Sequence, residues 1–374
     1  MKHIKGLDTL RTFAVIFVII AHWGPNSFRT EPLKFIFSKL MPDGVFGVDL
    51  FFVLSGYLIT KILLRARYQA LPDQRLQIIK SFYIRRMLRI FPVYFLLVFI
   101  TAYVLGDEYV RNHILYFITY TSNILTFKES GRISLLHTWS LAVEEQFYLV
   151  WPWIIIYSPK KHLLKIILTA IGIGIISNLV LDYRYGEWAH VLLLPCITAF
   201  AIGALWAYVQ MYRRFEKTLI TAALLLLPVC IILLYINHNG DNRLILIRFV
   251  NSVIAVNAII YASREKYNRV SGYIFNNKLL VNIGKISYGV YLYHFILPVY
   301  YNAFINYLRP KIGLSDHMLK ILTMPPSAYL IRLGFLFILS ILSYRYIELV
   351  FLRLKRNFSY VPVKKEYSPE VNGL

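Results

Sequence analysis

The chain has 374 residues, of which 58% are hydrophobic and 16% are charged, whereas soluble domains carry about 25% charged residues. Repeated apolar runs of about 20 residues therefore predict an all-α protein that crosses a membrane several times. The formal net charge is +22, but the basic residues cluster between apolar runs, so we expect no nucleic-acid partner. Cys196 and Cys230 lie inside apolar runs, which favours packing over a disulfide framework or a metal site.

A window of membrane-spanning length predicts about ten transmembrane helices, at residues 8–24, 45–64, 87–105, 139–157, 163–181, 190–209, 217–236, 243–262, 284–306 and 329–352. The connections rich in Lys and Arg alternate with mixed or acidic ones, which predicts that both termini are cytoplasmic. We expect the polar segment 106–138 to form an outer-face helix or a shallow re-entrant segment. Residues 1–352 are predicted to be one membrane domain, followed by a short basic cytoplasmic tail at 353–374.

The first predicted span contains two ionisable residues, Arg11 and His22. They are eleven residues apart, close to three helical turns, so both project from one helix face about 16 Å apart along the axis. Ionisable groups inside a span usually face the bundle interior or a cavity. The alternative is that Arg11 and His22 extend to the two membrane interfaces, with Arg11 paired to Asp8.

The second and fourth spans run inward and carry acidic residues near their outer ends. Asp49 opens the second span, with Ser55 deeper, where a small residue could also serve helix packing. Glu144 and Glu145 lie in the fourth span, and Glu144 shares its face with Tyr148 and Ser140. Two adjacent carboxylates in an apolar helix favour a functional role. A histidine oriented by a carboxylate is a common general base, so His22, Asp49 and Glu144 are predicted to form the catalytic group.

Two further groups are candidates for binding. Arg85, Arg86 and Arg89 stand three and four residues apart on the inner side, where guanidinium groups suit phosphate recognition. Ordinary anchoring at the cytoplasmic interface is the alternative. In the ninth span, Tyr291 and His294 share a face, and hydrogen-bonded packing is the alternative to a functional role for this histidine.

Five stretches together resemble the membrane acyltransferase-3 family of bacterial O-acyltransferases over about 350 residues. They are "GLDTLRTFAVIFVIIAHW", "GVDLFFVLSGYLIT", "FYIRRMLRIFPVY", "HTWSLAVEEQFYLVWP" and "ISYGVYLYHFILP". The first contains the family's pattern of a basic residue, ten spacers and a histidine, as Arg11 and His22.

The resemblance implies a multi-pass enzyme of the bacterial inner membrane that needs no metal. It would take an acyl group, usually acetyl, from cytosolic acyl-CoA and deliver it to a hydroxyl of an extracytoplasmic or lipid-linked glycan. His22 would be the catalytic histidine, Arg11 its motif partner and Glu144 the motif glutamate. The three arginines at 85, 86 and 89 would bind the donor. Transfer would finish in the membrane domain or pass to a separate extracytoplasmic acyltransferase.

Two questions stay open at this level. Histidine can act as a base or as a nucleophile, so direct transfer and a covalent acyl-enzyme are both consistent with the residues. A transporter or flippase for a glycolipid or a small anion could also use the polar interior, with Arg11 as a clamp and His22 as a proton relay. The lack of an internal sequence repeat argues against a transporter built from inverted repeats.

Overall fold

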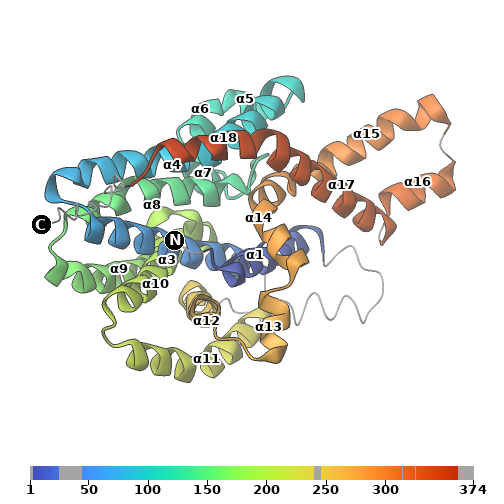
Figure 1. Ribbon diagram of the computed structural model, residues 1–374. Helices are drawn as coiled ribbons and strands as arrows, with labels where there is room; N and C mark the ends of the chain where they lie inside the picture. The colour runs from blue at the N-terminus through green and yellow to red at the C-terminus, as the bar shows by residue number, and fades with distance from the viewer. Residues whose placement is uncertain (1–2, 25–43, 240–245, 314, 325, 361–374) are drawn as a thin grey trace, which may run out of the picture.

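The computed structural model describes residues 3–24, 44–239, 246–313, 315–324 and 326–360. It is 86% helical, with no strand among these residues, which confirms the all-α prediction (Figure 1). The predicted tail at 353–374 is described as far as residue 360, and the rest of it lies outside the described residues.

The longer helices are α1 (Lys5–Trp23), α3 (Gly44–Gln69), α4 (Arg75–Phe99), α8 (Thr138–Tyr157), α9 (Leu163–Tyr185), α10 (Leu193–Tyr212), α11 (Glu216–Asn239), α12 (Ile247–Arg264), α14 (Lys278–Tyr293), α15 (Leu297–Ile312) and α17 (Ser327–Ser343). The shorter helices are α5 (Glu108–Asn112), α6 (Ile114–Ile118), α7 (Ser122–Lys128), α13 (Arg269–Phe275), α16 (Asp316–Thr323) and α18 (Leu349–Leu354). Single π-helical turns follow α4 at Ile100–Val104 and α17 at Tyr344–Glu348. Short 3₁₀ turns include η6 at Glu187–Val191.

Seven helical segments of the described chain are long and apolar enough to cross a membrane. They include α1, α3, α4, α9, α10, α11 and α17, and each overlaps a predicted span. Helices α8 and α12 also overlap predicted spans, although their composition does not place them among the seven. The first residues of the span predicted at 243–262 lie outside the described residues. The protein is therefore a helical, multi-span membrane protein.

The predicted span at 284–306 is wrong as a single helix, because α14 ends at Tyr293 and α15 begins at Leu297. The cause is Pro298, which has no backbone N–H to bond the carbonyl of His294 four residues earlier. Trp23 Nε1 donates to that carbonyl instead, at 2.9 Å. The break places His294 at a corner of the chain, and α15 and α16 extend beyond the bundle (Figure 1).

Helix α3 is the centre of the bundle, since it packs against α1, α4, α8, α10 and α12. Its closest approach is to α10, where Gly56 faces the backbone of Phe200 and Gly203 faces the backbone of Val53. A side chain at either glycine would collide with the opposite main chain, so this crossing requires residues without a Cβ. The crossing holds the face of α3 that carries Ser55 toward α8.

The segment expected to be one outer-face helix or a re-entrant segment, 106–138, consists of three short helices, α5, α6 and α7. Asp107 caps α5 by accepting a hydrogen bond from the backbone of Val110. Helix α7 packs against α8 and against η6. These helices therefore support the end of α8 at which Glu144 lies.

Candidate functional site

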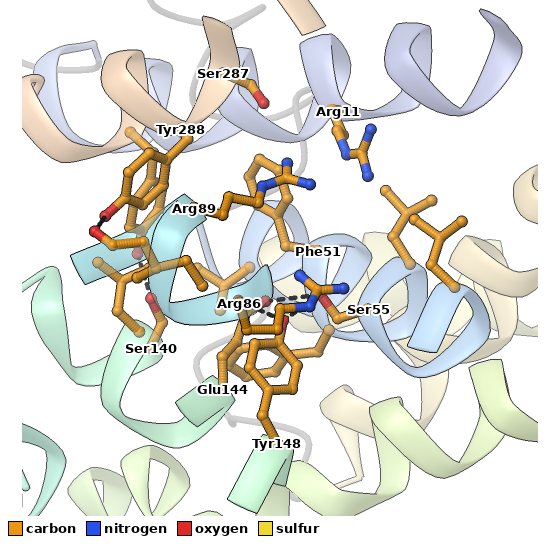
Figure 2. A pocket seen from close by; sticks show the side chains of 17 residues that line it. Arg11, Phe51, Ser55, Arg86, Arg89, Ser140, Glu144, Tyr148, Ser287 and Tyr288 are labelled. Carbon is orange, nitrogen blue, oxygen red and sulfur yellow. Dashed lines mark hydrogen bonds between the residues drawn. The ribbon is translucent and has the colours of Figure 1, made fainter. Parts of the chain in front are cut away.

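A cavity of about 90 Å³ lies between α1, α3, α4, α8 and α14 (Figure 2). We call it the arginine pocket, because Arg11, Arg86 and Arg89 enter it from two helices. Its remaining lining residues are Val48, Phe51, Phe52, Leu54, Ser55, Leu58, Ile90, Ser140, Leu141, Glu144, Tyr148, Ser287, Tyr288 and Tyr291. Three guanidinium groups beside one lining carboxylate give the pocket a positive balance, which suits an anionic or strongly polarised ligand.

Glu144 is held by two hydroxyl groups. Ser55 donates to its Oε1 and Tyr148 donates to its Oε2, each at 2.9 Å. Tyr148 also lies beneath Arg86, whose guanidinium carbon is 4.8 Å from the ring centroid. The predicted face of Glu144, Tyr148 and Ser140 is confirmed, since all three line the arginine pocket (Figure 2).

Glu145, the other glutamate of the pair, points away from this pocket and does not line it. Its Oε1 is buried without a hydrogen-bond partner. Neighbouring residues on a helix point about 100° apart, so only one of the two glutamates can face the arginines. Glu144 therefore remains the candidate, and Glu145 has no contact here that supports a role.

The predicted trio of arginines is divided by the structure. Arg86 and Arg89 line the arginine pocket, whereas Arg85 turns to the C-terminal segment. Arg85 donates to the carbonyls of Lys355 at 2.8 Å and Phe358 at 2.9 Å, and its guanidinium lies 5.0 Å from the ring centroid of Tyr360. Arg11 reaches the arginine pocket and also pairs with Asp8 at 2.5 Å, as the alternative interpretation expected.

His22 lies in a second cavity, of about 290 Å³, which we call the histidine pocket. It is lined by His22, Trp23, Phe295, Pro298, Val299, Ala328, Tyr329 and Arg332. Arg11 thus lines the arginine pocket and His22 lines the histidine pocket, at two positions along α1. Helix α14 borders the first pocket, and the turn after α14 borders the second. The structure does not place these two residues in a single cavity.

Hydrogen bonds assign the tautomer of His22. Its Nδ1 lies 2.9 Å from the carbonyl oxygen of Val18, which can only accept, so Nδ1 carries the proton. The same Nδ1 lies 3.3 Å from Nε2 of His294. His294 Nδ1 donates to the carbonyl of Tyr291 at 2.5 Å, which leaves its Nε2 as an acceptor for His22. The Nε2 of His22 therefore keeps a basic lone pair.

One helical turn, Tyr291 to Phe295, separates the two pockets. Tyr291 faces the arginine pocket, where its hydroxyl contacts Ser140 at 2.6 Å, and Phe295 faces the histidine pocket. His137 lies against this turn, with ring centroids 5.4 Å from His294 and 5.2 Å from Phe295. Both ring nitrogens of His137 are buried without a hydrogen-bond partner.

No described group of three or more His, Cys, Asp or Glu side chains is arranged to hold a metal ion.

Asp49, which is predicted to belong to the catalytic group, makes its described hydrogen bonds to α12. It forms a buried ion pair with Arg248, and its other oxygen accepts from Asn251 at 3.0 Å. Arg248 also donates to the carbonyl of His190 at 3.0 Å. These contacts join α3 to α12 and to η6, so Asp49 stabilises the packing of these elements. Glu144 is likewise bonded to Ser55 and Tyr148. Nδ1 of His22 is paired with the carbonyl of Val18 and with His294.

Comparison with known proteins adds the chemistry to this geometry. A family model described as an acyltransferase domain matches residues 4–345. The chain belongs to this acyltransferase family. It is 32% identical over 387 residues to the peptidoglycan O-acetyltransferase OatA of Listeria monocytogenes, covering 93% of this chain and 55% of that protein. It is 27% identical over 399 residues to the O-acetyltransferase OatA of Staphylococcus aureus, covering 97% of this chain and 60% of that protein.

The acyltransferase domain thus spans somewhat more than half the length of the curated relatives it matches. No solved structure matches the chain. The resemblance of the five sequence motifs to the acyltransferase-3 family is confirmed by the family match.

Sequence reasoning missed two residues of the acyltransferase domain: Arg332, which lines the histidine pocket, and His137, which packs against the turn between the two pockets. His137 opens the motif "HTWSLAVEEQ" and was passed over beside the more conspicuous glutamates. Arg332 interrupts the apolar run "SAYLIRLGFLFILS", and the rule that ionisable residues in spans are costly would have identified it.

Proposed function

We propose that this acyltransferase domain transfers an acetyl group from cytosolic acetyl-CoA to a hydroxyl of a cell-surface glycan. The observation that carries the proposal is the pair of pockets on either side of the turn from Tyr291 to Phe295, at the end of α14. One pocket contains three guanidinium groups and a hydrogen-bonded glutamate, and the other contains a histidine with a basic ring nitrogen. Peptidoglycan is the first acceptor to test, because the relative from Listeria monocytogenes is named for it.

In this proposal the protein lies in the bacterial plasma membrane with ten membrane crossings and both termini in the cytoplasm. The basic connections of the sequence support that orientation. Helices α8 and α12, together with the broken α14–α15 segment, supply the crossings beyond the seven apolar helices. The donor then enters from the side of Arg85, and the acceptor reaches the end of α1 at which His22 lies.

The donor nucleotide has a separate cavity available. A cavity of about 640 Å³ is lined by Ile62, Arg65, Ala66, Tyr68, Gln69, Arg85, Met211 and Tyr360. It provides guanidinium groups for phosphates and aromatic rings for a base. By contrast, the arginine pocket, at about 90 Å³, has room for a small acyl group and not for a nucleotide.

One face of α3 connects the two cavities. Ser55 and Leu58 line the arginine pocket, and Ile62, Arg65 and Gln69 line the larger cavity, at alternating spacings of three and four residues. Ser55 and Arg65 are ten residues apart, about 15 Å along the helix, a span comparable to an extended pantetheine arm. A CoA thioester bound along this face would place its acyl group beside Glu144.

The chemical step in the proposal balances through His22. Its Nε2 removes the proton of the acceptor hydroxyl, and the oxygen forms a bond to the acyl carbon as the carbon–sulfur bond breaks. CoA leaves as the thiolate, and the proton on Nε2 of His22 passes to it, which returns His22 to its neutral form. His294 Nε2 shares the Nδ1 proton of His22 and so stabilises the imidazolium in place of the carboxylate expected from the sequence. Guanidinium groups in the arginine pocket stabilise charge on the thioester oxygen.

The test uses purified protein in lipid nanodiscs with radiolabelled acetyl-CoA and fragments of peptidoglycan. We expect labelled ester on the glycan and release of CoA, both lost in His22→Ala. His317→Ala is the matched control, because His317 is exposed on α16 and lines none of the described pockets. A transporter would consume no thioester. Absence of both glycan ester and CoA release with the wild-type protein, across several surface glycans, would overturn the proposal.

A further inference from the structure

The histidine pocket contains an arginine whose charge no described carboxylate neutralises. Arg332 of α17 donates from Nη2 to the amide oxygen of Asn302 at 2.6 Å, and its guanidinium lies 5.3 Å from the ring centroid of Tyr301. Its Nε is buried without a hydrogen-bond partner. The pairing differs from that of Arg11 with Asp8 and of Arg248 with Asp49, where a carboxylate offsets the charge.

A guanidinium in an apolar helix is costly unless a partner or a ligand offsets its charge. Asn302 and Tyr301 are neutral, so they satisfy hydrogen-bonding geometry without supplying the missing negative charge. An oxyanion would supply it, and guanidinium groups bind carboxylates and phosphates through two parallel hydrogen bonds. The unpartnered Nε is one donor of such a pair. Arg332 is therefore prepared for an anion that the protein does not itself provide.

The surroundings of Arg332 also have the character of a sugar site. The same pocket contains His22 at the end of α1, and aromatic walls from Trp23, Phe295 and Tyr329. Trp23 and Tyr329 lie edge to face, with centroids 5.7 Å apart. Aromatic faces pack against the C–H faces of sugar rings. The cavity thus combines an apolar stacking surface, one cation and one base.

We propose that Arg332 binds an anionic group, a carboxylate or a phosphate, carried by the acceptor glycan, and so makes the histidine pocket selective for acidic or phosphate-linked glycans. This inference rests on the proposed function, because the anion is taken to belong to the acceptor. Arg332 acts as a specificity residue that positions the glycan against His22.

The first experiment measures binding alone, without turnover. Three probes share one tetrasaccharide of N-acetylglucosamine: the neutral form, a form with a lactyl carboxylate on one sugar, and a form with a reducing-end phosphate. Binding to wild-type protein in nanodiscs is measured by thermophoresis. We expect at least one anionic form to bind about tenfold more tightly than the neutral form. The two anionic arms show which source of negative charge the pocket prefers.

The variants assign that preference to Arg332. Arg332→Gln is expected to reduce it to within about twofold of the neutral probe, and Arg332→Lys to keep only part of it, because lysine has no guanidinium fork. Arg309→Gln is the matched control, since Arg309 is exposed on the neighbouring α15 and pairs with Asp316. Equal binding of all three probes by the wild-type protein would overturn the inference, even if a variant failed to fold. A preference that survives in folded Arg332→Gln would do the same.

The second experiment separates this inference from the proposed function. Acetyl-CoA is added with each probe, and CoA release is followed. Anion binding through Arg332 without CoA release would support the anion site and refute the proposed acetyl transfer. If acetyl transfer to the neutral probe were as efficient as transfer to both anionic probes, the proposed function would be supported and the anion site refuted.

Discussion

Adding one methyl group at Gly56 tests whether the α3–α10 crossing positions the candidate site. A Cβ on Gly56 would lie 2.0 Å from the carbonyl oxygen of Phe200, whereas ordinary contact begins near 3.4 Å. The two helices would have to part by about 1.4 Å to restore normal contact. Ser55, the preceding residue, donates to Glu144 at 2.9 Å. A shift of that size along this bond would lengthen it to about 4.3 Å, which is no longer a hydrogen bond.

The expected result of Gly56→Ala follows from that displacement. Overpacking of this kind costs about 1–3 kcal/mol in stability, and a misplacement of about 1 Å in a reactive site can cost on the order of 100-fold in rate. We therefore expect a folded protein with a lower unfolding temperature and a rate of CoA release reduced by about tenfold to 100-fold. The assay is CoA release from acetyl-CoA with glycan in nanodiscs, beside thermal unfolding.

Gly172→Ala is the matched control, because a Cβ on this residue of α9 would meet nothing within 4 Å. It should leave both the rate and the unfolding temperature unchanged. If Gly56→Ala behaved like Gly172→Ala in both measurements, the argument that close packing at this crossing positions Ser55 would be refuted.

Three further substitutions test other parts of the structure. Glu144→Gln replaces the acceptor of two charge-assisted hydrogen bonds, each worth about 1.5–3 kcal/mol, and should lower CoA release at least tenfold in folded protein. Asp49→Ala leaves the Arg248 charge buried and should lower the free energy of unfolding by about 3–5 kcal/mol. The measurement is the unfolding temperature, which should fall in Asp49→Ala and rise part of the way back in the double variant with Arg248→Leu. Equal unfolding temperatures for Asp49→Ala and the wild-type protein would contradict the stabilising role of Asp49. Arg85→Ala removes the donor to two carbonyls of the C-terminal segment 355–360, so limited proteolysis should cut this segment faster than in the wild-type protein.

The sequence by itself determined the features that depend on one helix at a time. Apolar runs of spanning length predict most of the long helices, because hydropathy is a local property of the chain. Helical periodicity placed Ser140, Glu144 and Tyr148 on one face, and all three line the arginine pocket. The ordered motifs indicated the acyltransferase family, which the match over residues 4–345 confirms. None of these conclusions depends on which helix packs against which.

The tertiary structure decided which partners those faces meet. Asp49 is bonded to Arg248, 199 residues away, and no helical period predicts that pairing. The break at His294 depends on Trp23, which comes from the far end of α1 and takes the carbonyl that Pro298 leaves free. His22 consequently meets His294 where a carboxylate was expected. Such contacts depend on how the helices pack together, and packing is set by side chains that lie far apart in the chain.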